Sequence, residues 1–165
     1  MSNKKSPSHP IFSYKIKFLI LIILIMNLQC TPPITPLIIG HRGAKGHIAE
    51  NTLPSVAKAM ELDVDGIEVD VFICKSGELV VFHDKKLDRL TNVQGYIESL
   101  EYDSIQKLKV LGEYKIPTLG QVLELIDGAV FLNIELKGSG TAEPTHKILT
   151  PLMNGKKWTA DHFII

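Results

Sequence analysis

The feature that most constrains the fold is a strict alternation of side chains in residues 66–72, GIEVDVF. Successive side chains of a β-strand point to opposite faces. The aliphatic side chains share one face: Ile67, Val69 and Val71. Glu68 and Asp70 share the other face with Phe72. Two carboxylates on one face are costly to bury unless a cation or a basic group compensates them, so this strand predicts a site as well as a fold.

Strand-like and helix-like segments alternate along the rest of the chain. Short apolar or alternating runs predict strands at 36–39, 66–72, 79–82 and 131–136, with another run opening at 163–165. Helical periodicity predicts helices after the capping pair Asn51-Thr52, at 119–126, entered from Pro117-Thr118, and at 146–153. Ser76-Gly77 forms a turn that makes 79–82 the second strand of a hairpin. This order indicates an α/β fold built from βαβ units around a parallel sheet.

The amino terminus has the pattern of an export leader. Lys15 and Lys17 precede the apolar run 18–26, which is shorter than the ~20 residues that span a bilayer. Cys30 follows the run and resembles the acylated cysteine of bacterial lipoproteins, although Gln29 is not the small residue usual before it. We therefore expect a leader at 1–29 and a Pro-rich spacer at 30–36. A signal peptide with an incidental cysteine and an uncleaved membrane anchor remain as alternatives.

Charge and cysteine content exclude some classes of protein. Residues 1–29 hold four of the 18 Lys and Arg and no acid, so the rest of the chain has 14 basic against 18 acidic residues. Such a balance leaves no basic stripe of the kind that binds nucleic acid. Two cysteines are too few for a disulfide framework.

A third carboxylate joins the first two at the same strand period. The segment NIELK places Asn133, Glu135 and Lys137 on one face of its strand, with Glu135 near the carboxyl end. Carboxylate oxygens suit Ca²⁺ or Mg²⁺. The alternative is that Glu68, Asp70 and Glu135 are exposed positions on an ordinary half-polar sheet.

Two histidines lie where predicted strands end. His41 and Arg42 come directly after the first strand, and His83 ends the run 79–82 and is followed by Asp84. Arginine is a planar, permanently charged phosphate ligand, and two histidines can serve as an acid/base pair. The alternative for each histidine alone is a loop residue that is bonded to the backbone.

Four segments together resemble the glycerophosphodiester phosphodiesterase family. They are IIGHRGAKGHIAENT, GIEVDVFICKSGELVVFHD, KIPTLGQVLELI and NIELKG, and their order and spacing match over residues 37–138. The resemblance implies a TIM-type (β/α) barrel, of which residues 37–165 hold the first three to four β/α units. It also implies an insertion at about 73–114.

The resemblance also implies roles for individual residues. Glu68, Asp70 and Glu135 fall on the family's metal ligands, for Ca²⁺ or Mg²⁺. His41 and His83 fall on its catalytic histidines, for attack and for the leaving group respectively. The residues expected to contact substrate are Arg42, Lys137 and Glu50. For Glu50 the alternative is a charge favoured by the helix dipole. The implied reaction is hydrolysis of glycerophosphodiesters to glycerol 3-phosphate and an alcohol, in lipid and glycerol phosphate metabolism.

The length leaves two further functions open. A typical barrel takes ~250 residues, so we expect either a fragment of a longer enzyme or a truncated, non-catalytic surface lipoprotein. A sphingomyelinase D-like phospholipase is the other alternative. We expect the 165-residue chain alone to be inactive, with its carboxylate face open to water. We also expect export to the periplasm or exterior, attachment to a membrane through the leader or a lipid, and no nucleic-acid partner.

Overall fold

The computed structural model describes residues 14, 16–22 and 35–165. The chain divides into two units, Met1–Pro36 and Leu37–Ile165. In the first unit residues 16–22 are helical, and none of the helices in the described ranges is long and apolar enough to cross a membrane. Cys30 and the greater part of the predicted leader and spacer lie outside the described residues. The leader therefore stays a prediction.

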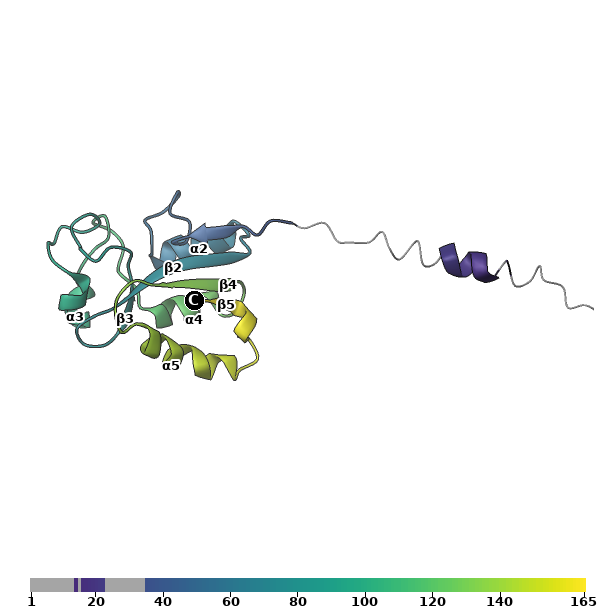
Figure 1. Ribbon diagram of the computed structural model, residues 1–165. Helices are drawn as coiled ribbons and strands as arrows, with labels where there is room; N and C mark the ends of the chain where they lie inside the picture. Colours follow the sequence, from purple (N-terminus) through teal and green to yellow (C-terminus); the bar gives the residue numbers. More distant parts are fainter. Residues whose placement is uncertain (1–13, 15, 23–34) are drawn as a thin grey trace, which may run out of the picture. The chain divides into compact units, whose positions relative to one another are not determined.

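The second unit is built on a sheet in which four strands run parallel in the order β1-β2-β4-β5. These strands are β1 (Ile39–His41), β2 (Gly66–Ile73), β4 (Phe131–Leu136) and β5 (Phe163–Ile164). The long, buried strand β2 lies between β1 and β4, and Figure 1 shows β2 and β4 side by side. The predicted parallel sheet is confirmed, and so is each strand predicted at 66–72 and 131–136.

A fifth strand, β3 (Leu79–Val81), extends the sheet as an antiparallel partner of β2. β1 pairs with Gly66–Glu68, whereas β3 pairs with Val71–Ile73 of the same strand. The turn between β2 and β3 is closed by a hydrogen bond from the Gly77 N–H to the Cys74 carbonyl at 3.0 Å. The predicted hairpin is therefore present, and it continues the sheet at the carboxyl end of β2.

Two helices begin at the capping residues that the sequence indicates. In α2 (Leu53–Glu61) the Thr52 side chain accepts from the Ser55 N–H. In α4 (Leu119–Ile126) Thr118 and Gln121 form a reciprocal capping box, and the helix ends at Asp127 in the left-handed conformation. Side-chain oxygens thus satisfy backbone N–H groups that have no partner within the helix.

Two predicted bounds are wrong by a few residues. The first strand was expected at 36–39 but β1 is Ile39–His41, because its extent is set by the residues of β2 that pair with it. The last helix was expected at 146–153 but α5 is Ala142–Met153. Pro144 falls in its first turn, where a missing N–H costs little, so it extends the helix start instead of excluding it.

Two hydrophobic clusters hold the unit together. The first lies between the aliphatic face of β2 and β4 and the helices α2, α4 and α5, and includes Val69, Ile134 and Val56. The second is formed by Phe72 of β2 and by the segment between β2 and α4, which contains α3 (Tyr102–Ile105) and lies at one end of the unit in Figure 1. The members of the second cluster include Phe72, Phe82, Leu87, Leu90, Ile97, Ile105, Val110 and Ile116. This segment therefore carries a core of its own beside the carboxyl end of β2.

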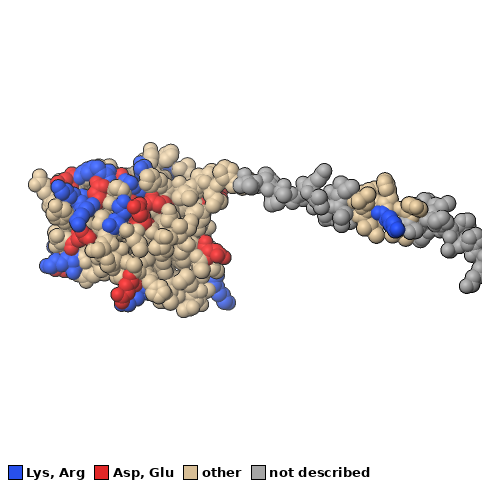
Figure 2. All heavy atoms as spheres, viewed as in Figure 1, with Lys and Arg blue, Asp and Glu red and all other residues tan. Residues whose placement is uncertain are grey.

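Charged side chains of both signs are interleaved on the face drawn in Figure 2. Lys and Arg lie beside Asp and Glu there, and no stripe of one sign gathers on that face. The segment between β2 and α4 also carries pairs of opposite charge, Lys75–Glu101 and Lys85–Glu98.

Candidate active site

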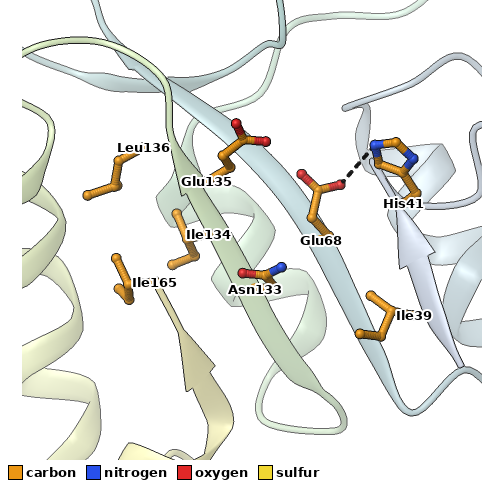
Figure 3. A pocket seen from close by; sticks show the side chains of 8 residues that line it. All are labelled: Ile39, His41, Glu68, Asn133, Ile134, Glu135, Leu136 and Ile165. Carbon is orange, nitrogen blue, oxygen red and sulfur yellow. Dashed lines mark ion pairs between the residues drawn. The ribbon is translucent and has the colours of Figure 1, made fainter. Parts of the chain in front are cut away.

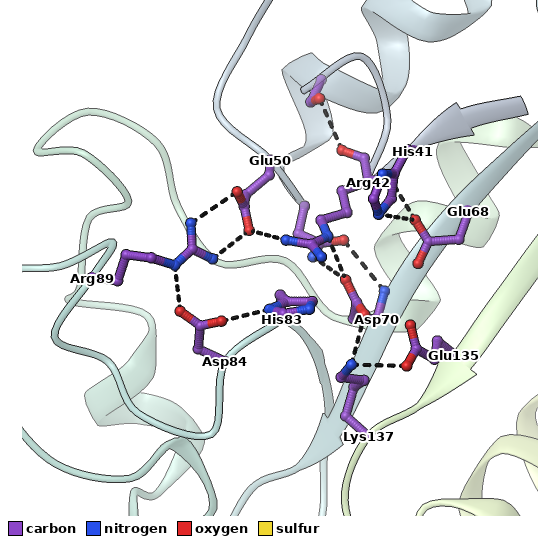
Figure 4. A network of polar contacts seen from close by, with 12 residues as sticks. His41, Arg42, Glu50, Glu68, Asp70, His83, Asp84, Arg89, Glu135 and Lys137 are labelled. Atoms are coloured by element: carbon purple, nitrogen blue, oxygen red, sulfur yellow. Dashed lines mark hydrogen bonds and ion pairs between the residues drawn. The ribbon is translucent and has the colours of Figure 1, made fainter. Parts of the chain in front are cut away.

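Three carboxylates meet on the face of the sheet that is opposite to the helices. Glu68 and Asp70 lie on β2 and Glu135 lies on β4, and the strand register pairs Asp70 directly with Glu135. One carboxylate oxygen of each lies within 4.8 Å of the other two, and Figure 4 shows the three side chains converging from the two strands. The structure thus brings together the residues predicted as metal ligands.

The carboxylates differ greatly in exposure. Relative side-chain exposure is 0% for Asp70, 11% for Glu68 and 54% for Glu135. The expectation that this face is open to water is therefore wrong for the two acids of β2, as is the alternative that they are ordinary exposed positions. The loop after β1 covers them, because Asn51 Nδ2 donates to Asp70 Oδ2 at 2.8 Å and the Arg42 guanidinium packs beside it.

Burial and basic neighbours move the pKa values of these acids in opposite directions. Loss of hydration raises the pKa of Glu68 and of Asp70 above the ordinary carboxyl values. Lys137 Nζ lies 2.8 Å from Glu135 Oε1 and 3.7 Å from Asp70 Oδ1. Its hydrogen bond lowers the pKa of Glu135. Lys137 therefore belongs to the site, where its ammonium group contacts one carboxylate of β2 and one of β4.

Two of the carboxylate oxygens have no hydrogen-bond partner. Within the part of the chain that the structure describes, Glu68 Oε1 and Asp70 Oδ1 are buried and unbonded. A buried anionic oxygen without a partner is costly, and a divalent cation compensates it well. Three carboxylates with two such oxygens fit the hard, oxygen-preferring ions Ca²⁺ and Mg²⁺.

Arg42 contacts three acidic side chains at once. Its backbone N–H donates to Glu68 Oε2 at 2.8 Å, and its Nη1 donates to Glu50 Oε1 at 2.9 Å. Its Nε lies 3.3 Å from Asp70 Oδ2. Arg42 and Glu50, both predicted to contact substrate, are thus connected directly to the carboxylate cluster (Figure 4).

The loop that carries Arg42 has an unusual backbone. Arg42 and Asn51 both adopt positive φ, at 54° and 56°, and the Asn51 N–H donates to the Arg42 carbonyl at 3.0 Å. Such values are uncommon outside glycine and concentrate at functional sites. Gly43, at φ 76°, allows the close approach of the loop to Ser55 at the start of α2.

The two predicted catalytic histidines have different surroundings. The His41 side chain is 54% exposed, and its Nε2 lies 3.8 Å from Glu68 Oε2. Partial burial, together with the charges of Lys45 and Arg42, lowers the pKa of His41. His83 lies on the other side of the cluster, with its Nδ1 2.5 Å from Asp84 Oδ1. Figure 4 shows both rings beside the carboxylates, so the structure brings both histidines to one site.

Three residues of this arrangement were not predicted from the sequence. Asn51 was interpreted only as a helix-capping residue, yet its side chain bonds Asp70. Asp84 was noted only as the neighbour of His83, and Arg89 was not singled out. Arg89 bonds both Asp84 and Glu50. Arg89 is one of only two arginines in the chain, a signal that could have identified it.

An open cavity of about 650 Å³ adjoins the cluster on the same face of the sheet (Figure 3). Polar side chains line one part of it: His41, Glu68, Asn133 and Glu135. Apolar residues line the rest, among them Ile39 and Ile165. The site therefore opens onto a space that has room for a small phosphodiester.

Comparison with known proteins identifies the same family across the described second unit. The family model for the glycerophosphoryl diester phosphodiesterase family matches residues 41–161. A glycerophosphodiester phosphodiesterase from Caldanaerobacter subterraneus is 46% identical over 110 residues, which cover 61% of this chain and 45% of the relative. One from Bacillus altitudinis is 39% identical, with 62% and 45% covered. The chain thus spans about half the length of the curated relatives that it matches.

Solved structures that resemble this chain belong to the same class of phosphodiesterase. A phosphodiesterase from Oleispira antarctica, in complex with its product sn-glycerol-3-phosphate, matches with a TM-score of 0.65 and 32% identity, over 76% of this chain and 54% of that one. A glycerophosphodiester phosphodiesterase from Thermotoga maritima matches with a TM-score of 0.65 and 33% identity, over 71% and 51%. The parallel sheet with its helices is part of a TIM-type barrel. On the family match, the fold and the arrangement of the site, this chain belongs to the glycerophosphoryl diester phosphodiesterase family.

Proposed function

We propose that the protein containing this chain hydrolyses glycerophosphodiesters to glycerol 3-phosphate and an alcohol, and that it requires Ca²⁺ or Mg²⁺. The observation that carries the proposal is the cluster of Glu68, Asp70 and Glu135, in which two buried oxygens have no hydrogen-bond partner among the residues that the structure describes. Two histidines and two basic side chains adjoin this cluster, as the reaction requires. The family membership supports the same reaction class.

The three carboxylates would hold the divalent ion. When bound, the ion would offset the charge of the phosphodiester and of its transition state, which a purely acidic cluster would repel. The chain offers both exposed and buried oxygens for this purpose, since Glu135 is open to solvent whereas Asp70 is not. The choice between Ca²⁺ and Mg²⁺ depends on ligand number and flexibility, so we propose a hard divalent ion as the cofactor class.

The basic side chains would bind the phosphate. Arg42 is held in place by Glu50 and Asp70, and Lys137 by Glu135 and Asp70, so both cations are oriented before substrate arrives. Fixed positive groups that face developing negative charge stabilise a transition state more than mobile ones.

The histidines would move the protons. His41 is largely exposed, its lowered pKa favours the neutral ring, and a neutral imidazole accepts a proton from the attacking group. His83, whose Nδ1 is engaged by Asp84, would protonate the departing alcohol through Nε2. Proton acceptance on one side of the phosphate and donation on the other completes the hydrolysis.

The decisive experiment follows glycerol 3-phosphate release by the whole protein, with glycerophosphocholine and glycerophosphoethanolamine as substrates. We expect release with Ca²⁺ or Mg²⁺ and none after chelation by EDTA. Sphingomyelin serves as the comparison substrate for the phospholipase alternative. Cleavage of sphingomyelin without glycerol 3-phosphate release would overturn the proposal, as would inactivity toward every substrate, which fits the non-catalytic lipoprotein.

We also propose that the protein is exported and attached to a membrane through residues 1–29 or a lipid on Cys30. The support is the sequence pattern of two lysines, a short apolar run and a cysteine. A lipid chain supplements weak membrane binding in proportion to its buried methylene groups.

A further inference from the structure

We propose that Arg89 is a positioning residue that fixes His83 through Asp84 and, at the same time, fixes Arg42 through Glu50. Its catalytic consequence rests on the hydrolysis proposed above. Arg89 comes from the segment between β2 and α4, which carries the second hydrophobic cluster. This segment would thereby set the geometry of both the proton donor and a phosphate-binding group.

The contacts of the Arg89 guanidinium use all three of its nitrogens. Nε donates to Asp84 Oδ2 at 2.5 Å. Nη1 and Nη2 donate to the two oxygens of Glu50, at 3.0 Å and 2.7 Å. Arg89 thus joins two carboxylates that lie 34 positions apart in the sequence, and Figure 4 shows them above and below its guanidinium.

Each of these carboxylates also contacts one of the side chains to which we assign a role in the reaction. The second oxygen of Asp84 lies 2.5 Å from His83 Nδ1. Glu50 Oε1 also accepts from Arg42 Nη1 at 2.9 Å. The guanidinium lowers the pKa of Asp84 and of Glu50, so both stay ionised and able to accept.

The backbone around Arg89 is held by the second hydrophobic cluster. Its neighbours Leu87 and Leu90 are buried, and the Leu87 N–H donates to the Gly95 carbonyl at 2.9 Å. The Thr91 N–H returns to the Leu87 carbonyl at 3.0 Å, which closes a turn around Arg89. The backbone at Arg89 is therefore held in place, even though 47% of the Arg89 side chain is exposed.

Only an arginine can make these three bonds together. A guanidinium presents a planar fork that matches one carboxylate with two nitrogens while Nε faces another group. A lysine keeps the charge but offers a single ammonium at the end of a flexible chain. Substitution of Arg89 by lysine therefore removes the geometry of the three hydrogen bonds while it keeps the positive charge.

The consequence for His83 concerns which ring nitrogen carries the proton. An ionised carboxylate only accepts hydrogen bonds, so Asp84 requires the proton of a neutral His83 ring on Nδ1. Nε2 is then the atom left for the reaction: it is unprotonated in the neutral ring, and when the ring takes up a second proton Nε2 carries the one that the departing alcohol receives. Release of Asp84 frees the ring to rotate and to exchange tautomers. Arg89 acts on this balance without touching the substrate.

The test compares Arg89→Gln, Arg89→Lys and Asp84→Asn with the control Lys75→Gln. Lys75 also belongs to the segment between β2 and α4 and forms an exposed ion pair with Glu101 at 2.7 Å, away from the site. Ring ¹⁵N resonances of His83, measured in the 165-residue chain without substrate, report the tautomer. Turnover and KM are then measured for glycerophosphodiester hydrolysis by the whole protein.

We expect the His83 resonances of the unsubstituted chain to show the Nδ1–H form, and those of both Arg89 variants and Asp84→Asn to move away from it. Both Arg89 variants should lose about 10²-fold in kcat with a smaller change in KM, since misplacing a group by about 1 Å has an effect of that size. Lys75→Gln should change neither quantity.

Three results would overturn the proposal: unchanged His83 resonances in Arg89→Gln, full kcat in Arg89→Lys, or an equal loss in Lys75→Gln. If Arg89→Gln fails to fold, the near-isosteric Asp84→Asn decides the same question from the other end of the contact. A whole protein that releases no glycerol 3-phosphate would refute the proposed hydrolysis alone, because the His83 resonances in the 165-residue chain still test the positioning.

Discussion

Replacement of Gly43 by alanine tests whether the loop after β1, which carries Arg42, depends on one close backbone approach. Gly43 has φ 76°, and a Cβ added there would lie 2.6 Å from both the carbonyl carbon and Oγ of Ser55. Real Cβ atoms do not approach that closely, so the loop or the start of α2 must move.

The magnitude follows from two separate effects. A left-handed backbone costs a residue with a Cβ roughly 1–2 kcal/mol, and overpacking a filled site costs typically about 1–3 kcal/mol. Gly43→Ala should therefore lower the free energy of unfolding by about 2–5 kcal/mol. Gly112 offers the matched control, because it has φ 77° and nothing within 4 Å of its added Cβ. Gly112→Ala should show only the backbone effect.

Urea denaturation of the 165-residue chain, followed by circular dichroism, measures both variants. Gly43→Ala should lose about 1–3 kcal/mol more of the free energy of unfolding than Gly112→Ala, and this difference is the effect of the contact with Ser55. Calcium affinity, measured by calorimetry, should fall in Gly43→Ala and stay unchanged in Gly112→Ala, since Arg42 and its backbone N–H bond to Glu68 move with the loop. Equal destabilisation by the two substitutions would refute the reasoning.

Four further predictions concern the site and the leader. Glu68→Gln should weaken divalent-ion binding by at least about tenfold in calorimetry, and unchanged affinity would remove Glu68 from the ligand set. His41→Ala and His83→Ala should each lower kcat of the whole protein by ~10²–10⁴-fold with less change in KM, whereas near-normal turnover would contradict that histidine's role. The pKa of Glu50 is lowered from 4.5 in the folded chain, so the stability that its carboxylate contributes is present above pH 4.5 and is lost as the pH falls through the lowered pKa. When urea unfolding is measured at a series of acidic pH values, Glu50→Gln should therefore lose less stability over that pH range than the unsubstituted chain. An identical loss in both would contradict this assignment. Mass spectrometry of the membrane fraction should find Cys30 as a lipid-modified amino terminus, and an unmodified Cys30 would defeat the lipoprotein prediction.

Local pattern was enough to predict much of the fold. Side chains alternate across a strand regardless of the tertiary structure, so GIEVDVF alone placed Glu68 and Asp70 on one face. Capping residues act within one helical turn, and Thr52 and Thr118 marked the starts of α2 and α4 correctly. The ends of β1 were less predictable, because an edge strand extends only as far as its partner pairs with it.

The composition of the site was also visible in the sequence, but its contacts were not. The residues predicted as metal ligands meet because strand register places Asp70 beside Glu135. Burial of Asp70 depends on a loop residue, Asn51, that is 19 positions away, and no local pattern reports such a contact.

What the sequence by itself determined was the order of strands and helices, the face that carries the carboxylates and the likeness to one family. What only the tertiary structure decided was which oxygens are buried without a hydrogen-bond partner in the described part of the chain, and how Arg89 joins Asp84 to Glu50. The physical reason is range: dihedral preference, alternation and capping act between near neighbours, whereas desolvation and ion pairing depend on segments that folding brings together.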